Sequence, residues 1–79
     1  MIEQVIEELK ANFQNAHVDI QSDGSHFNVL IVSDDFIGVR PVKKQQMVYA
    51  ILNPHIASGA MHAVNMRLLT QSEWSESQS

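Results

Sequence analysis

The sequence has 79 residues, 44% of them hydrophobic and 18% charged, which predicts a single globular domain rather than a disordered chain. It contains no cysteine, which excludes a disulfide scaffold, a thiolate zinc site, a catalytic thiol and an iron–sulfur cluster held by this chain's own thiolates. Nine Asp and Glu against five Lys and Arg leave a formal charge of -4, which argues against a general nucleic-acid binder. No apolar run approaches the ~20 residues of a membrane span and no basic leader opens the chain, so we expect a cytoplasmic protein without a membrane partner.

Near the N-terminus, apolar side chains recur at the spacing of one helix face and predict an amphipathic helix. They are Ile2, Val5, Ile6, Leu9 and Phe13. Two strands are predicted to follow, over roughly residues 17–21 and 25–33. The connection Ser22-Asp23-Gly24 has the composition of a turn, since Gly tolerates positive φ and Asp bonds to its own backbone.

A loop over residues 34–40 leads to a second predicted helix, which Pro41 opens in its first turn. Pro54 interrupts the helical pattern, so the helix either kinks there or ends near Leu52 and restarts with a short turn. The pair Ser58-Gly59 is expected to close it, because Gly is the usual residue just after a helix end.

The last elements are a third strand over residues 61–69 and a short final helix. Thr70 and Glu73 have the spacing of a capping box, which places Trp74 about one turn into that helix. The polar residues 75–79 are expected to form a flexible tail. The order α-β-β-α-β-α predicts an α+β fold with a three-stranded mixed sheet.

The connection between the second and third strands has a geometric consequence. It contains a helix of more than ten residues, which favours a parallel, right-handed crossover. If these two strands are neighbours, their N-terminal ends lie at one edge of the sheet. His26 and His62 head the two strands, so we expect them to lie close together.

Four segments in this order and spacing resemble the BolA family, and most closely its acid-stress-related bacterial branch. They are Asp23-Gly24-Ser25-His26-Phe27, Phe36-Ile37-Gly38, Val42-Lys43-Lys44-Gln45-Gln46-Met47-Val48-Tyr49 and Met61-His62-Ala63-Val64. The similarity covers roughly residues 1 to 74, which we take as a single BolA-like domain. The resemblance implies a class II KH-like fold, in agreement with the order of elements read from the pattern.

The resemblance also implies a function. The chain would be a non-enzymatic partner of a monothiol glutaredoxin, forming a heterodimer that shares a [2Fe–2S] cluster. His62 matches the family's near-invariant cluster ligand, and His26 stands at the hairpin position that is His or Cys in different subgroups. The partner's cysteine and a glutathione thiol would supply the sulfur ligands, so this chain would hold no cluster alone.

The chain departs from the family pattern in three places. Arg40 stands where Ser is common, which removes a side-chain cap from the following helix. Pro54 is unexpected inside that helix. The Gly-x-x-Gly loop with which KH domains clamp a nucleic-acid backbone is absent, because residues 38–41 keep only the first glycine. This last departure weighs against direct nucleic-acid binding.

Each histidine also has a simpler interpretation. His62 shares strand parity with Val64, so it can be a core residue bonded to a backbone carbonyl. His26 follows a turn and can be an exposed turn residue, while His17 and His55 belong to no motif and are expected to be solvated. Two histidines cannot complete a tetrahedral site, which excludes a self-sufficient zinc centre.

Three of the five basic residues, Arg40, Lys43 and Lys44, lie within five positions. They form either a solvated helix start or a surface for a partner. The rival function is a transcriptional regulator that binds DNA through the helix around residues 38–49. A third interpretation is a homodimeric structural protein whose histidines bind nothing. The adjacent carboxylates Asp34-Asp35 are not expected to converge on one substrate, and no nucleophile–base arrangement is present, so no enzyme is predicted.

Overall fold

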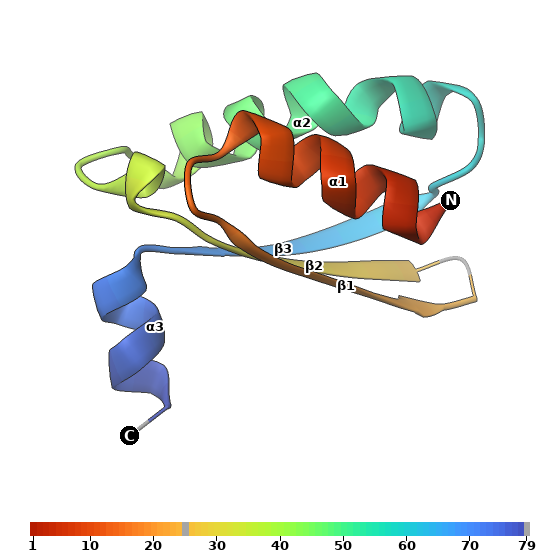
Figure 1. Cartoon of the computed structure of the whole chain (residues 1–79). Helices are drawn as coiled ribbons and strands as arrows, with labels where there is room; N and C mark the ends of the chain where they lie inside the picture. Colours follow the sequence, from red (N-terminus) through yellow and green to blue (C-terminus); the bar gives the residue numbers. More distant parts are fainter. Residues whose placement is uncertain (25, 79) are drawn as a thin grey trace.

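A computed structural model describes residues 1–24 and 26–78 of the chain. Its elements are α1 (Ile2–Asn12), β1 (His17–Asp23), β2 (His26–Val32), the 3₁₀ turn η1 (Asp34–Phe36), α2 (Pro41–Ala57), β3 (Ala63–Leu69) and α3 (Gln71–Ser77). The predicted order and the α+β class are confirmed. Figure 1 shows α1 and α2 side by side on one face of the sheet, while α3 projects away from the opposite face.

The sheet has the order β1-β2-β3, with β2 at its centre. β1 and β2 form an antiparallel hairpin, whereas β3 runs parallel to β2. The crossover through α2 therefore has the predicted parallel sense. In this register His26 pairs with Asp23 on one side and with Ala63 on the other.

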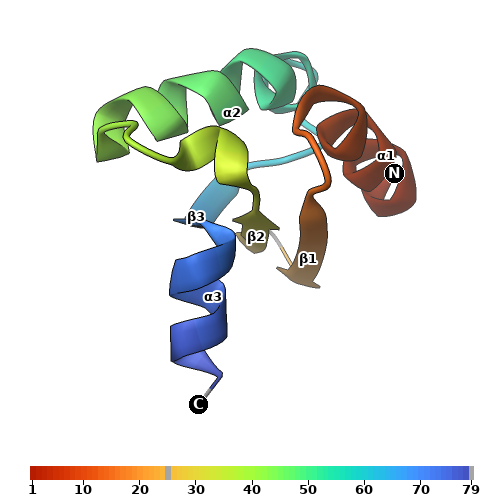
Figure 2. The ribbon, with the colours of Figure 1, turned by 60° about the vertical axis from the view of Figure 1, so that its left-hand side comes forward.

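The core lies between the helices and one face of the sheet, because the strands alternate between buried and exposed side chains. Its buried residues are Val5, Leu9, Phe13, Val18, Ile20, Phe27, Val29, Ile31, Phe36, Val48, Leu52 and Met61. Among the described residues, no helix layer covers the opposite face, and α3 stands at its end (Figure 2). There the ring of Trp74 stacks on His17 with 5.8 Å between centroids.

Helix α2 runs without interruption through Pro54 to Ala57, so the predicted end near Leu52 is wrong. Proline lacks the N–H that would donate to the carbonyl one turn earlier. Pro54 stands in the last turn, and its own carbonyl still accepts from the N–H of Ser58 at 3.1 Å, so the helix closes after it. Gly59 follows with φ +84°, as expected of the residue after a helix end.

The region predicted as a loop over residues 34–40 begins with the turn η1, capped by the buried Ser33. The carboxylates of Asp34 and Asp35 point to different backbone groups. Asp35 accepts from the N–H of Gln14 at 2.9 Å, and Asp34 accepts from the N–H of Gln71 at 3.0 Å. They tie the loop to the connection between α1 and β1 and to the start of α3.

Both the capping box and the final helix are present. The N–H of Glu73 donates to the Thr70 hydroxyl, and the Thr70 N–H donates to the Glu73 carboxylate at 2.8 Å. The hydrogen bond from the Thr70 N–H to this carboxylate holds the pKa of Glu73 below its usual range. Helix α3 reaches Ser77, so part of the segment predicted as a flexible tail is helical, while Ser79 lies outside the described residues.

The strand ends differ from the predictions by one or two residues. β1 extends to Asp23, and β3 begins at Ala63 rather than at Met61. β2 is described from His26 to Val32, and Ser25, predicted as its first residue, lies outside the described residues. In the part of the chain that the structure describes, no helix has the length and apolar character needed to cross a membrane.

Candidate functional site

His26 and His62 lie at the same end of the sheet, where β2 and β3 begin, and we call these two residues the histidine edge. His26 is the first residue of β2 and pairs with Ala63, the first residue of β3. His62 immediately precedes Ala63, and adjacent strands lie only about 4.8 Å apart. Both side chains are exposed. The crossover topology thus places the backbones of two histidines that are distant in sequence on neighbouring chain segments.

The interpretation of His62 as a core residue is wrong. Strand alternation would place it with Val64 on the covered face, but β3 begins only at Ala63 and the alternation does not reach back to His62. The residue before it, Met61, is 1% exposed and belongs to the core. The position of His62 is therefore set by a buried neighbour, while its own ring stays in solvent.

The loop that leads to His62 is held by a single carbonyl at the end of α2. The backbone oxygen of His55 accepts from the N–H groups of Ala60 at 3.0 Å and Met61 at 3.2 Å. It also accepts from the hydroxyl of Ser58 at 3.0 Å. Three donors converge on one acceptor, so the segment before His62 has a defined conformation.

On the other side of the histidine edge, the β1–β2 hairpin carries His26. Gly24 adopts φ +65°, a conformation that glycine tolerates best. The hydroxyl of Ser22 donates to the Gly24 carbonyl at 3.3 Å. Asp23 pairs with His26 at the turn end of the hairpin, so His26 lies directly beside the turn.

The donor set at this edge is incomplete for a metal centre. Among residues 1–24 and 26–78, no three His, Asp or Glu side chains gather closely enough to hold a metal ion. The two exposed imidazoles would supply at most two ligands to a metal group, and because the chain has no cysteine any thiolate ligand would have to come from another molecule.

The predicted basic group lies at the far end of the sheet from the histidine edge. Helix α2 follows the C-terminal end of β2, and its 17 residues span about 25 Å before the chain returns to the start of β3 (Figure 1). Arg40 and Lys43 are exposed at the start of this helix, and Arg40 makes no side-chain cap, as predicted. The ammonium group of Lys44 lies over the ring of Phe36, 5.9 Å from its centroid. The two predicted groups thus form separate surfaces.

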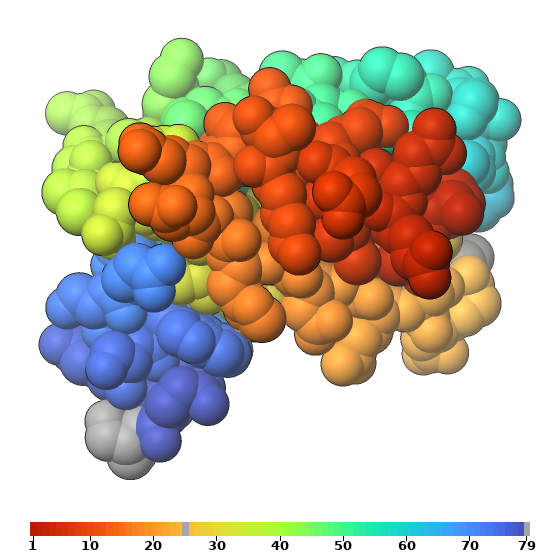
Figure 3. Space-filling model, in the orientation of Figure 1, coloured from red at the N-terminus to blue at the C-terminus, as the bar shows by residue number. Residues whose placement is uncertain are grey.

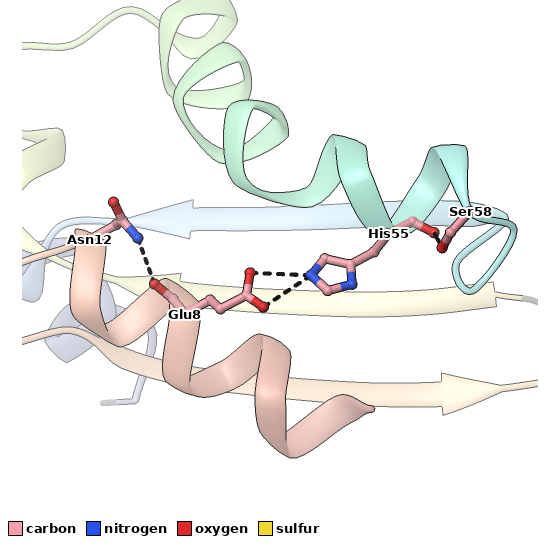
Figure 4. Close-up of polar contacts among 4 residues, drawn as sticks. All are labelled: Glu8, Asn12, His55 and Ser58. Atoms are coloured by element: carbon pink, nitrogen blue, oxygen red, sulfur yellow. Dashed lines mark hydrogen bonds and ion pairs between the residues drawn. The ribbon is translucent and has the colours of Figure 1, made fainter.

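His55 is not the solvated residue that its sequence context predicts. Its Nε2 atom lies 3.2 Å and 3.1 Å from the two carboxylate oxygens of Glu8, and its side chain is only 19% exposed (Figure 4). The contact joins the end of α2 to the middle of α1. The partners are 47 positions apart, and only the packing of the two helices brings them together.

The elements, their order and their register define a BolA-type α+β domain of the class II KH-like kind. The chain matches the family model described as BolA-like protein over residues 4–73. It belongs to the BolA family.

Three relatives place it within that family. The acid stress protein IbaG of Escherichia coli K12 is 46% identical over 57 residues, covering 72% of this chain and 68% of that protein. The DNA-binding transcriptional regulator BolA of Haemophilus influenzae is 32% identical over 84 residues, covering 92% of this chain and 81% of that protein. The structure of BolA1 from Arabidopsis thaliana superposes with a TM-score of 0.80 at 31% identity, covering 90% of this chain and 92% of that one.

Proposed function

We propose that this protein is a non-enzymatic cytoplasmic partner of a monothiol glutaredoxin, with which it forms a heterodimer that shares a [2Fe–2S] cluster. Such a complex would serve iron–sulfur cluster trafficking or an iron- or stress-dependent regulation. The observation that carries the proposal is the histidine edge, where the exposed His26 begins β2 and the exposed His62 immediately precedes β3. Membership of the BolA family and the similarity to an acid stress protein support it.

In this complex the chain contributes two imidazole nitrogens, and the glutaredoxin cysteine and a glutathione thiol contribute the sulfur ligands. Replacing thiolate by imidazole raises the potential of a [2Fe–2S] cluster. Imidazole also takes up protons near neutral pH, which makes the ligation sensitive to acid. His62 is the principal ligand because the buried Met61 and the His55 carbonyl fix its backbone, and His26 is the second ligand.

The test is a titration of the protein into a cluster-loaded monothiol glutaredoxin, followed by visible absorption and circular dichroism. We expect a new spectrum at a 1:1 ratio for the wild type and its loss with His62→Ala. His26→Ala is expected to change the spectrum without preventing formation of the complex. His17→Ala is the matched control, because this exposed histidine lies at the opposite end of β1 from the hairpin. A spectrum unchanged on mixing, or one that survives His62→Ala unaltered, contradicts the proposal.

The alternative function is that of a DNA-binding transcriptional regulator acting through residues 38–49. It is favoured by the exposure of Arg40 and Lys43 and by the similarity to the DNA-binding transcriptional regulator of Haemophilus influenzae. DNA-binding titrations across salt concentrations separate the two functions. A steep salt dependence that is reduced when Lys43 and Lys44 are changed to Ala supports DNA binding, whereas weak binding indifferent to these changes contradicts it.

A further inference from the structure

The sheet face opposite α1 and α2, which we call the open face, carries two rows of side chains across the strands, all of them polar except Leu30. The first row is Asp19, Leu30 and Arg67, and the second is Gln21, Asn28 and Asn65. These six residues line one shallow hollow of about 330 Å³. Figure 3 shows open space beneath the sheet, next to α3. No helix of the described chain covers this hollow.

The charges of the open face are poorly matched within one chain. Among the described residues, Arg67 lies in no ion pair, and Asp19 accepts one long hydrogen bond from the Gln21 amide at 3.5 Å. Asp19 and Arg67 stand on the two outer strands, on either side of Leu30. Two strand spacings of about 4.8 Å separate their backbones. The face therefore presents an acid on one side and a base on the other, at equal distances from its centre line.

We propose that a second copy of this chain docks on the open face about a two-fold axis that runs parallel to the strands. Such an axis places β1 of one copy over β3 of the other. Asp19 of each copy then faces Arg67 of the other copy, and the two Leu30 side chains meet near the axis. A two-fold axis across the strands would instead set Asp19 against Asp19, so the charge pattern selects the first arrangement.

The second row of the open face is compatible with the same axis. Gln21 of one copy faces Asn65 of the other, and Asn28 faces itself. Amide side chains both donate and accept, so they pair with copies of themselves. The side-chain Nδ2 of Asn65 already donates to the side-chain Oδ1 of Asn28 at 3.3 Å within one chain, which orients this row before docking.

Helix α3 has the dimensions that this arrangement requires. In both views of the ribbon it projects outward from one end of the open face (Figures 1 and 2). Its 7 residues rise about 10 Å, which equals the usual separation of two packed sheets. The axis puts the two copies of α3 side by side at one end of the dimer, so they form an end wall rather than a steric block.

The open face is small, because three strands of 7 residues measure roughly 14 by 23 Å. Interfaces of this size are at the weak, transient end of specific association. We therefore expect a dimer that dissociates on dilution and weakens with salt. The inference does not rest on the proposed cluster function, since its residues are distinct from the histidine edge.

Sedimentation equilibrium of the full chain, from about 10 μM to about 1 mM, measures this association. Asp19→Arg and Arg67→Asp each convert both intermolecular pairs into repulsions and are expected to weaken the dimer at least about tenfold. Mixing the two variants restores it. One copy then presents arginine at both positions and the other presents aspartate at both, so every contact in the mixed dimer is attractive.

The matched controls are Glu7→Arg and Lys10→Asp, which make the same charge changes at exposed positions of α1 and are expected to leave association unchanged. Circular dichroism checks that each variant folds, and the neutral changes Asp19→Asn and Arg67→Gln replace any variant that does not. A wild type that stays monomeric at 1 mM overturns the proposal. A mixture that associates no better than its two components overturns it as well.

Discussion

The two faces of the central sheet differ in what they contribute to the protein. On the covered face, Phe27, Val29 and Ile31 of β2 are at most 5% exposed and pack under the two helices. On the open face, the alternate residues His26 and Asn28 of the same strand are exposed. The period of two in a strand thus separates buried core residues from exposed residues within a single segment. Substitutions on the two faces should therefore have different effects on stability.

The largest effect on stability is expected on the covered side. Leu52 of α2 is fully buried, so Leu52→Ala removes buried apolar atoms and leaves a cavity. We expect the free energy of unfolding to fall by about 2–5 kcal/mol, as measured by urea denaturation. Gln45→Ala, at an exposed position of the same helix, is the matched control and should change it by less than about 0.5 kcal/mol. Equal losses for both variants would contradict the assignment of the core to this face.

A smaller effect is expected at α3, beside the open face. Thr70→Ala removes the hydroxyl that accepts from the Glu73 N–H, and an N-cap of this kind contributes about 1 kcal/mol. Because α3 is short and terminal, the change should loosen this helix and leave the core intact. The loosening of α3 is measured by its rate of amide hydrogen exchange, compared with the rate in β2. Faster exchange throughout the sheet would show instead that α3 is essential to the whole fold.

The same cap should depend on pH in a defined direction. The hydrogen bonds from Thr70 lower the pKa of Glu73 from its ordinary value of 4.5. The ionised carboxylate therefore stabilises α3 fully above 4.5, and this contribution is lost as the pH falls through the lower pKa of the folded state. Trp74 lies one turn into the helix and reports the change by fluorescence. In Glu73→Gln, whose amide does not titrate, this acid transition should be absent.

The smallest effect on stability is expected at the histidine edge. His26 and His62 are exposed and belong to no buried cluster, so replacing either with Ala should change the free energy of unfolding by less than about 0.5 kcal/mol. The same urea measurement checks this. A large loss would mean that these histidines support the fold, and a spectral defect of the variants would then say nothing about ligation.

Local patterns predicted much of this architecture. Helical spacing located α1, the capping box located α3, and the long connection through α2 predicted that His26 and His62 meet at one edge. The errors have physical causes. Pro54 was expected either to kink α2 or to end it near Leu52, yet proline removes only its own N–H from the hydrogen bonding and the helix continues to Ala57. His55 was expected in solvent because no local pattern indicates that Glu8 lies beside it.

The sequence by itself determined the order of the elements and, through the absence of cysteine, that any iron–sulfur cluster here must draw its thiolates from a partner. These follow from residue types and their spacing along the chain, which are local properties. Only the tertiary structure decided that the basic residues stand at the other end of the sheet from the histidine edge. It also decided that His17 stacks on Trp74 and that Asp19, Leu30 and Arg67 share one row. Strand register and helix packing set these relative positions, and neither can be predicted from a short stretch of sequence.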